Sequence, residues 1–417
     1  MPEHIVIVGA GQAAAQAIDT LRRREFRGRI TLIGDEAFLP YQRPPLSKKY
    51  LAGALARERL ALRSESYYAE RAVELRLGHR CVRIDRDTHR IGLDDGEVIA
   101  YDALLLATGS RPRALQVPGA QLPGVFYLRT LADVDAIHAR LREVRRVAVI
   151  GGGYIGLEVA ATCRELGHDA VVLEMADRVM NRVVCPRVSR FFEAEHARHG
   201  VRIVLDARVA AVVGAQRAEG VALADGSIHP ADLVVVGVGA EAADGLARQS
   251  GLECTDGICV DEHCRTSDRL IHAAGDCTNH PSRHYGRRVR LESVDGAFEQ
   301  GTVAALDMLG EPAIYDKVPW FWSDQYDLKL VIVGLALDHE QIVLRGDPAT
   351  RAFSACYLRA GELVAIETVN RAKDQIAARK LIAGRARFDP TKLSDPDILL
   401  KDCTLTGIMS QAPAFPG

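Results

Sequence analysis

The most informative absence in this chain is that of paired cysteines. Its 417 residues include nine cysteines, an odd number, and no two of them are separated by two residues. Cys254, Cys259 and Cys264 recur every five residues, a spacing that suits neither a zinc site nor an iron–sulfur cluster. We therefore expect no metal site, and we interpret the cysteines as reduced thiols of a cytoplasmic protein.

Long hydrophobic runs and an excess of one charge are also missing. No apolar stretch approaches the roughly 18 residues of a membrane-spanning helix, and no basic segment precedes the first apolar run, so we expect neither a membrane span nor a secretory signal. The formal net charge of −2 argues against bulk binding to nucleic acid. With 48% hydrophobic and 26% charged residues, the composition is that of a globular protein of two or three domains.

What the chain does contain is a dinucleotide-binding pattern in its middle. An apolar run at residues 147–150 precedes a G-x-G-x-x-G turn, and a helical segment then leads to a second apolar run that ends at Glu174. The three glycines are Gly151, Gly153 and Gly156. Such glycines allow a tight turn against a pyrophosphate, and a terminal carboxylate accepts from a ribose hydroxyl and repels a 2′-phosphate. The pattern predicts NADH; the alternative is a strand–helix turn without a ligand.

A second unit of this kind opens the chain. An apolar run at residues 5–8 is followed by Gly9, Gly11 and Ala14 with the spacing G-x-G-x-x-A, and the strand expected at residues 29–33 leads to Asp35. Asp35 is the candidate for an adenosine ribose, although an aspartate there could also serve a turn. Two such units predict two dinucleotides meeting at an interface. Residues 103–109 and 232–239 each read as a strand running into glycine, which indicates a weak internal repeat.

The pattern changes from about residue 318. Alternating runs predict antiparallel strands at residues 328–333, 341–345, 353–358 and 363–368, followed by a helix over 371–383. A helix is also expected over residues 300–309, and the tail after Pro390 is expected to wrap the surface. We interpret this last part as a separate α+β domain.

Nine segments occur in a recognisable order. They are GAGQAAA, LIGDE, PYQRPPLSK, LATGSRPR, YLRTL, GGGYIGLE, TSDRLIHAAGDC, RLESV and VPWFWSDQYD. From Ile5 to about Leu381 the chain thereby resembles the FAD-dependent ferredoxin reductases of bacterial oxygenase systems. The resemblance implies an α/β protein with two Rossmann-like domains of the glutathione-reductase type and a C-terminal α+β domain. It divides the chain into an FAD domain (1–113 and 241–317), an NAD domain (114–240) and a C-terminal interface domain (318–417).

The resemblance also implies the cofactor contacts. Around FAD it places Gly9, Gly11, Ala13, Asp35, Arg43, Lys48, Cys81, Thr108, Gly109, Arg129, Asp276 and Val294. Around NADH it places Gly151, Gly153, Gly156, Glu174 and Gly239. Asp295 and Gly296 depart from the Pro-Asn or Gln-Asn pair expected after RLESV, which leaves the detail of the flavin edge open.

No cysteine occurs before Cys81, so a redox-active thiol pair cannot follow the first glycine turn. Flavin must then pass electrons directly from NADH, a two-electron donor, to an acceptor that takes one at a time. The resemblance implies that Lys48 lies near flavin N5 and pairs with Glu158, that Tyr154 covers the ring, and that Trp322 lies at the electron exit. The alternatives are surface charges, ordinary helix packing and an aromatic domain interface.

The partner implied is a [2Fe–2S] ferredoxin that serves a cytochrome P450 or a Rieske oxygenase. Ferredoxins are usually acidic, so a basic docking face is expected. The candidate cations are Arg287, Arg288, Arg290, Lys373, Arg379 and Lys380. The rival hypotheses are a rubredoxin reductase, an oxidase that reduces oxygen, and a redox-sensing flavoprotein of the apoptosis-inducing type.

Overall fold

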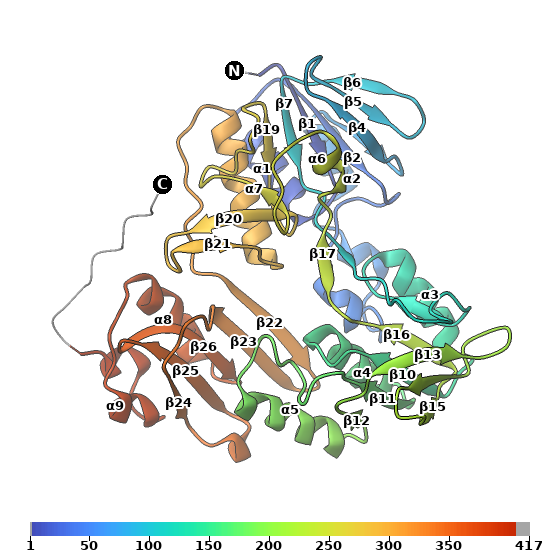
Figure 1. The fold of residues 1–417 in the computed structure, drawn as a ribbon. Coiled ribbons are helices and arrows are strands. Elements are labelled where there is room, and N and C mark those ends of the chain that lie inside the picture. The colour runs from blue at the N-terminus through green and yellow to red at the C-terminus, as the bar shows by residue number, and fades with distance from the viewer. Residues whose placement is uncertain (1, 406–417) are drawn as a thin grey trace.

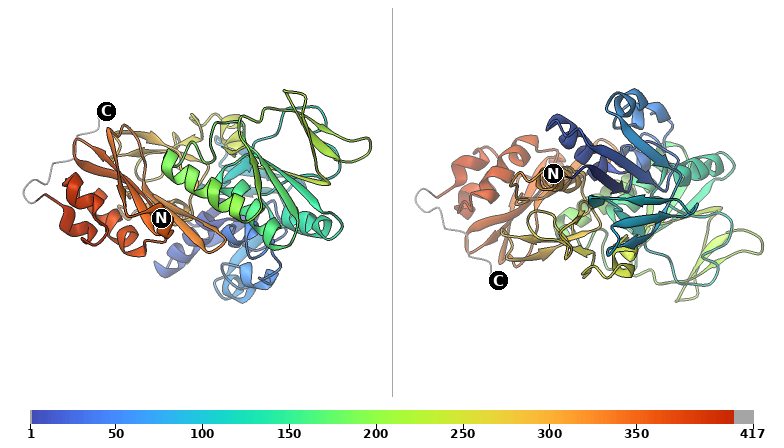
Figure 2. Two further views of the ribbon diagram at one scale, coloured as in Figure 1. Left: turned by 90° about the horizontal axis from the view of Figure 1, so that it is seen from below. Right: turned by 90° about the horizontal axis from the view of Figure 1, so that it is seen from above.

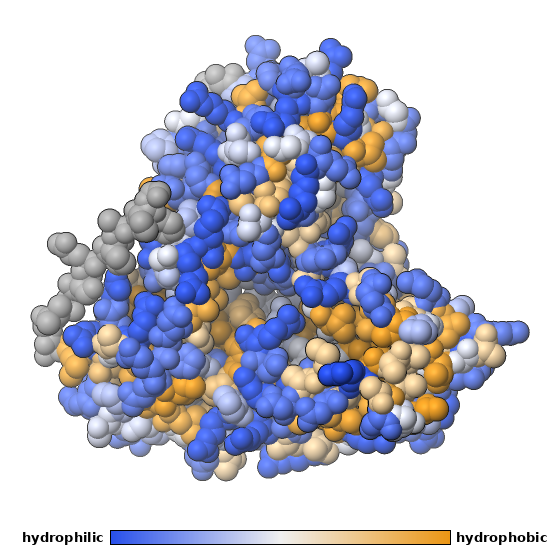
Figure 3. Space-filling view, viewed as in Figure 1, coloured by the Kyte–Doolittle hydropathy of each residue, from blue (hydrophilic) through white to orange (hydrophobic). Residues whose placement is uncertain are grey.

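Three five-stranded sheets organise residues 2–405, the part of the chain that the computed structural model describes (Figure 1). In Figure 1 the first sheet lies at the top, the second at the lower right and the third at the lower left. The face drawn in Figure 3 is hollowed at its centre, where these three parts meet. None of the helices formed by residues 2–405 has the length and apolar character that a membrane span requires.

The first sheet is parallel and is built around the N-terminal strand. Its strands, in spatial order, are β19 (Ile271–Ala273), β7 (Ala103–Leu106), β1 (His4–Val8), β2 (Arg29–Gly34) and β3 (Val73–Leu77). Because strand side chains alternate, Ile5 and Ile7 face α1 (Gln12–Arg23) and α7 (Val294–Met308), whereas Val6 and Val8 face the other side. That other side is covered by the meander β4 (Cys81–Asp85), β5 (Arg90–Leu93) and β6 (Val98–Ala100).

The second sheet repeats this plan. Its strands are β9 (Val125–Tyr127), β16 (Leu233–Val236), β10 (Arg146–Ile150), β11 (Asp169–Leu173) and β12 (Arg202–Val204). One face packs on α3 (Leu131–Leu141), α4 (Tyr154–Glu165) and α5 (Pro186–Arg198), and the other on the meander β13 (Val209–Val213), β14 (Gly220–Leu223) and β15 (Ile228–Pro230). In both sheets the central strand leads through glycines into a helix, so the internal repeat predicted from the sequence is present.

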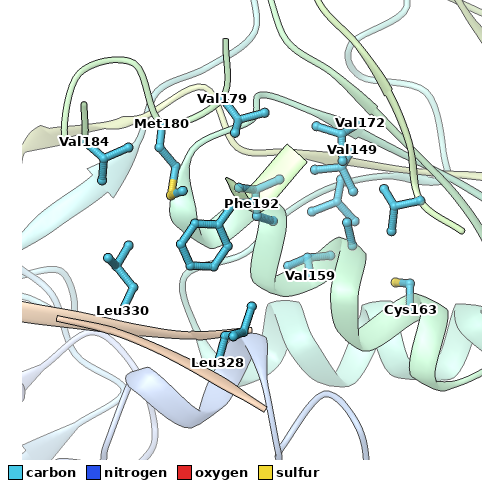
Figure 4. Close-up of a cluster of buried hydrophobic side chains, with 14 of the residues drawn as sticks. Val149, Val159, Cys163, Val172, Val179, Met180, Val184, Phe192, Leu328 and Leu330 are labelled. Atoms are coloured by element: carbon cyan, nitrogen blue, oxygen red, sulfur yellow. The ribbon is translucent and has the colours of Figure 1, made fainter. Parts of the chain in front are cut away.

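The third sheet is antiparallel and packs against the unit built around the second sheet. Its strands are β22 (Trp320–Gln325), β23 (Leu328–Gly334), β26 (Glu362–Val369), β25 (Phe353–Arg359) and β24 (Gln341–Arg345). One face is covered by α8 (Ala372–Ala383), and α5 lies along the other face, as the left view of Figure 2 shows. Leu328 and Leu330 of β23 meet Phe192 of α5 in this shared core (Figure 4).

Shorter elements complete the described chain. They are α2 (Glu65–Glu70), α6 (Gly245–Gln249), α9 (Pro390–Ser394), β8 (Ser110–Pro112), β17 (Ala240–Ala242), β18 (Ile258–Cys259), β20 (Thr278–Ser282), β21 (Arg287–Val289) and the 3₁₀ turns η1 (Pro44–Ser47), η2 (Arg57–Leu60), η3 (Pro348–Thr350) and η4 (Leu400–Cys403). The antiparallel pair β8–β17 runs between the first and second sheets (Figure 1).

Helix α7 and strand β22 differ from the sequence-based expectation. The helix expected over residues 300–309 begins at Val294, because the Ser293 hydroxyl accepts a hydrogen bond from the Gly296 N–H at 2.9 Å and caps it. Strand β22 forms where the sequence pattern predicts none. The tail up to residue 405 is anchored by buried Arg345, which donates to the carbonyls of Leu393, Asp395 and Ile398; the rest of the predicted tail lies outside the described residues.

Candidate functional site

The first glycine turn leaves open space at the N-terminus of α1. Gly9 has a φ of +107°, and a β-carbon there would lie 2.2 Å from the Ala107 carbonyl oxygen, so only glycine fits. A β-carbon on Gly11, the N-cap residue, would meet no described atom within 4 Å beyond its chain neighbours, and no side chain caps this helix. Ala13 is buried in the first turn of α1. The free N–H groups of α1 therefore face a cradle that suits an anion.

Several predicted FAD residues come together next to this turn. The β-carbon position of Gly9 lies 3.0 Å from the Thr108 nitrogen, and that of Gly109 lies 3.4 Å from Nη2 of Arg129. Arg129 in turn pairs with Asp276, with 3.2 Å between Nη2 and Oδ2. Residues 108–109, 129 and 276 are far apart in the sequence. The fold brings these three segments together and thereby pairs the positive charge of Arg129 with the negative charge of Asp276.

The remaining predicted FAD residues are dispersed around the first sheet. Asp35 directly follows β2 and is exposed, whereas the neighbouring Glu36 is held by Arg43, with 2.7 Å between Oε1 and Nη2. Cys81 begins β4 and is buried, and burial raises the pKa of its thiol to about 11, so it stays protonated near neutrality. Val294 is the first residue of α7.

A buried carboxylate joins all three parts of the molecule. Glu158 of α4 forms an ion pair with Lys48, with 2.7 Å between Oε2 and Nζ, and the Ser47 hydroxyl donates to the same oxygen at 2.5 Å. Its other oxygen accepts from the Ser323 hydroxyl of β22 at 2.6 Å. The expected contact between Lys48 and Glu158 is therefore present, and the two serines are partners that sequence reasoning missed.

Tyr154 begins α4 one turn before Glu158 and contacts the third sheet. Its ring lies 5.5 Å from that of Phe321, centroid to centroid. Burial, together with the nearby negative charges of Glu292, Asp276 and Glu158, raises the pKa of its hydroxyl. The Tyr154 hydroxyl therefore feels the charge of one carboxylate from each ion pair, Asp276 and Glu158.

The aromatic segment of β22 divides between the two faces of the strand. Trp320 and Trp322 stack with their ring centroids 5.4 Å apart, and both are half-buried next to the core that contains α8. Phe321, between them, points to the opposite face and to Tyr154. The strand therefore separates the two tryptophans from the residues that contact α4.

The second glycine turn is built like the first. A β-carbon on Gly151, whose φ is +106°, would lie 2.4 Å from the Gly237 carbonyl oxygen, and one on Gly156 would lie 2.2 Å from the carbonyl oxygen of Gly151. Gly153, the N-cap of α4, faces open space, and no side chain caps this helix. A second anion cradle therefore opens at the N-terminus of α4.

Glu174 lies at the end of β11 and holds this second turn. Its Oε2 accepts from the Gly152 N–H at 2.5 Å and its Oε1 from the Ala176 N–H at 2.8 Å. The nearest cation in sequence, Arg178, donates instead to the Val184 carbonyl and the Ser189 hydroxyl, at 2.8 Å each. Another residue that sequence reasoning missed is Arg182, whose Nη2 lies 3.2 Å from the β-carbon position of Gly239.

The six predicted docking cations fall into two groups. Arg287, Arg290 and Arg379 pair with Asp338, Glu292 and Asp295, at 3.1, 2.6 and 2.8 Å. Arg288 donates to the carbonyl oxygens of Val260 and Asn279. Lys373 and Lys380 are exposed on α8, and no carboxylate of residues 2–405 pairs with either. Exposed positive charge therefore lies both on α8 and at β21, where Arg287 and Arg288 are exposed although each makes contacts within the structure.

Comparisons with known proteins agree with this geometry. Residues 3–301 match the model of the pyridine nucleotide-disulphide oxidoreductases, and residues 320–404 match the reductase C-terminal domain. The chain belongs to the pyridine nucleotide-disulphide oxidoreductase family. It is 45% identical to the ferredoxin reductase subunit of 5,5′-dehydrodivanillate O-demethylase from a Sphingobium strain, over 96% of this chain and 98% of that one.

Solved structures place it more narrowly. The ferredoxin reductase for the CYP199A2 system of Rhodopseudomonas palustris superimposes with a TM-score of 0.93 at 43% identity, over 97% of this chain and all of that one. Putidaredoxin reductase in its covalent complex with putidaredoxin gives 0.93 at 39%, over 96% and 98%. The chain is thus an oxidoreductase of the ferredoxin-reductase type, and the predicted fold class and resemblance are confirmed.

FAD and a nicotinamide dinucleotide are the cofactors of this family. The structure fits both, because two uncapped helix N-termini face open space and only glycine is tolerated at the turns that lead to them. The cradle of α1 belongs to the first sheet and that of α4 to the second, which is the arrangement that two dinucleotides need.

Proposed function

We propose that this enzyme carries electrons from NADH through FAD to a [2Fe–2S] ferredoxin that serves a cytochrome P450 or a Rieske oxygenase. The observation that carries the proposal is the pair of open cradles at α1 and α4, together with the Lys48–Glu158 ion pair at α4. Relatives support the choice of acceptor: one is named as part of an O-demethylase, one as the reductase of a P450 system, and one was solved joined to putidaredoxin.

FAD is proposed to lie along the first sheet. Bound FAD accepts two electrons together and releases them singly. The chain holds it through the free N–H groups of α1 at the pyrophosphate, and through Asp35 at the adenosine ribose. The Arg129–Asp276 pair and the Thr108–Gly109 backbone border it further along, and the start of α7 at Val294 faces the ring. This proposal corresponds to a division into residues 1–113 and 241–317 for FAD, 114–240 for NADH and 318–417 for the interface domain.

Lys48 is proposed to present its ammonium group to the flavin ring. A cation there stabilises the reduced, electron-rich form, and Glu158 holds the ammonium in place at 2.7 Å. Tyr154 is proposed to cover the ring until nicotinamide displaces it. Its place at the start of α4, one turn before Glu158, and the influence of Asp276 and Glu158 on its hydroxyl support this role.

The nicotinamide dinucleotide is proposed to be NADH. Glu174 presents a carboxylate at the end of β11, where it accepts from a ribose 2′-OH and repels a 2′-phosphate. The hydrogen bonds that occupy Arg178 support this choice, because its guanidinium is already engaged by the Val184 carbonyl and the Ser189 hydroxyl. Gly239 and Arg182 border the same cradle.

Electrons are proposed to leave over Trp322 toward a ferredoxin docked on the first and third parts of the molecule. Lys373 and Lys380 supply exposed positive charge on α8, and between them Ile376 is 76% exposed. An exposed apolar side chain flanked by two cations suits an acidic partner with an apolar contact at its centre. A cytoplasmic location is proposed as well, supported by nine free cysteines.

The function is tested by offering alternative acceptors. Steady-state rates with NADH are measured for a [2Fe–2S] ferredoxin, a rubredoxin and oxygen, and ferredoxin is expected to be reduced fastest. Faster reduction of rubredoxin or of oxygen would replace the proposal with the corresponding rival.

A second experiment tests the place of Lys48. Lys48→Met is expected to retain FAD and to slow flavin reduction by NADH in stopped flow. An unchanged rate would return Lys48 and Glu158 to the role of a structural ion pair.

A further inference from the structure

Strand β22 presents a polar row to α4 that the proposed function leaves unexplained. Side chains alternate along a strand, so Phe321, Ser323 and Gln325 share the face opposite the two tryptophans. Ser323 and Gln325 are 0% and 1% exposed. Burying polar side chains in this way is costly unless each finds a partner, and here every one does.

The partners form one hydrogen-bonded chain that ends on Glu158. The Tyr326 hydroxyl donates to Nδ1 of His196 at 3.2 Å, and Nε2 of His196 donates to Oε1 of Gln325 at 2.8 Å. Nε2 of Gln325 then donates to the Ser323 hydroxyl at 3.1 Å, and that hydroxyl donates to Oε1 of Glu158 at 2.6 Å. Every donor points toward the carboxylate, which is the terminal acceptor.

The state of His196 agrees with this direction. The ring is buried on α5, and burial lowers its pKa to about 4, so the imidazole is neutral near pH 7. A neutral imidazole has one donor and one acceptor nitrogen, which is what the chain requires at this step. The Tyr326 ring stacks on His199 at 3.7 Å between centroids, which fixes its outer end.

We propose that Ser323 is a positioning residue for the Lys48–Glu158 pair, supported in turn by Gln325 and His196. With one carboxylate oxygen held by Ser323 and the other by Ser47 and Lys48, Glu158 cannot rotate, so the Lys48 ammonium keeps one direction. The C-terminal domain thereby completes the flavin site as well as contacting the partner. The inference rests on the proposed place of Lys48 beside FAD.

The decisive experiment compares four variants of the FAD-loaded enzyme: Ser323→Ala, Lys48→Met, their combination and Ser354→Ala. Ser354 is a matched control, because it is also fully buried in the third sheet and its hydroxyl also donates to a buried carboxylate, that of Asp374, at 3.0 Å. Three quantities are measured for each variant: bound FAD per chain, the midpoint potential of the flavin, and the rate of its reduction by NADH in stopped flow.

We expect Ser323→Ala to keep its FAD, to shift the midpoint potential to a more negative value and to slow reduction about tenfold, a factor equivalent to about 1.4 kcal/mol. The double variant should match Lys48→Met, because Ser323 acts only through that lysine. Ser354→Ala should leave all three quantities unchanged. Gln325→Met keeps the Ser323 hydroxyl but removes the hydrogen bond that Gln325 donates to it. This variant should change the midpoint potential and the reduction rate in the same direction as Ser323→Ala, by a smaller factor.

The outcomes separate the inference from the function beneath it. If Lys48→Met changes potential and rate while Ser323→Ala and Gln325→Met change neither, the positioning role is wrong and the role of Lys48 stands. If the effects of Ser323→Ala and Lys48→Met add, Ser323 acts by another route and the inference fails. If Lys48→Met itself changes nothing, the proposed place of Lys48 is wrong and the inference falls with it.

Discussion

At the scale of single residues, Glu174 shows how one carboxylate can serve both structure and specificity. Both of its oxygens accept backbone N–H groups, one from the glycine turn and one from the loop after β11. A carboxylate oxygen has further lone pairs, so these bonds leave room for a ribose hydroxyl. The backbone contacts fix the orientation in which Glu174 meets that hydroxyl.

Glu174→Ala should therefore weaken NADH binding and erode the preference for NADH over NADPH. We expect the ratio of kcat/KM for the two dinucleotides to fall about tenfold or more, since a ribose hydrogen bond and the repulsion of a 2′-phosphate are both removed. Asp177→Ala is the control, because Asp177 is an exposed carboxylate on the same loop. Equal or better kcat/KM with NADPH in the unaltered enzyme would refute the assignment.

At the scale of elements, the N-terminus of helix α5 contacts a buried carboxyl group of the third sheet, that of Glu367. Glu367 of β26 is buried, and both of its oxygens accept from the N–H of Cys185, the N-cap of α5, at 3.1 and 3.2 Å. The Tyr357 hydroxyl of β25 donates to the same carboxylate. A negative charge stabilises a helix N-terminus, whereas burial opposes it.

This contact should respond to pH. Burial raises the pKa of Glu367 to about 7, against the opposing effects of Tyr357, Cys185 and Arg178, so the folded protein holds this proton more tightly than the unfolded chain. The stabilisation from that proton is complete below the ordinary carboxyl pKa and is lost as the pH rises through about 7. The urea concentration at the midpoint of unfolding should therefore fall as the pH rises from about 5 to about 8. This fall should be smaller in Glu367→Gln than in the unaltered protein.

A suitable control lies on the same strand. Glu362 is partly exposed and pairs with Arg385 at 3.1 Å, so Glu362→Gln should keep the pH dependence of the unaltered protein. If Glu367→Gln keeps that dependence too, another group is responsible for it.

How far the sequence predicts these elements depends on what each residue contacts. The glycine turns were predictable because a backbone that approaches within 2.4 Å of a β-carbon position excludes every other residue. Strand β22 was not, because WFWSDQ buries two polar side chains, Ser323 and Gln325, and shows no apolar alternation. Ser47 and Ser323 lie 111 and 165 residues from Glu158 in the sequence, so only the fold reveals these contacts.

At the scale of the whole molecule, the predicted docking cations differ in how far their charge is compensated. The net charge is −2, and most of the predicted docking arginines are bound within the structure. Lys373 and Lys380 on α8 are exposed, with Ile376 between them. Of the exposed predicted cations without a carboxylate partner among residues 2–405, two therefore lie on α8 and one, Arg288, lies on β21.

Lys373→Glu combined with Lys380→Glu should raise the KM for ferredoxin about fivefold or more at low salt, and the difference should shrink at physiological salt, where exposed charges are screened over roughly 8 Å. Reduction of ferricyanide by NADH should be unaffected, because that small acceptor needs no docking face. Lys329→Glu, on the exposed side of β23, is the single-charge control. If ferredoxin and ferricyanide reduction decline together, the damage is to the flavin site.

Trp322→Ala addresses the exit itself and should slow ferredoxin reduction while sparing ferricyanide. Because Trp322 stacks on Trp320, the matched control is Trp320→Phe, which keeps an aromatic ring in the stack. Comparable slowing by both variants would assign the effect to the packing of the stack.

The two faces of β22 restrict how such reductases can exchange partners. One strand of six residues carries both the stacked tryptophans and the serine that meets Glu158. A chimera can be made with the C-terminal domain of another reductase in order to recruit the ferredoxin of that reductase. Its β22 then comes from the donor, whereas Glu158 on α4 comes from the host, so the contact between position 323 and Glu158 depends on both chains. Recombination within this family should succeed most readily where donor and host agree at positions 47, 158 and 323, and swaps confined to α8 should transfer partner choice without disturbing the flavin.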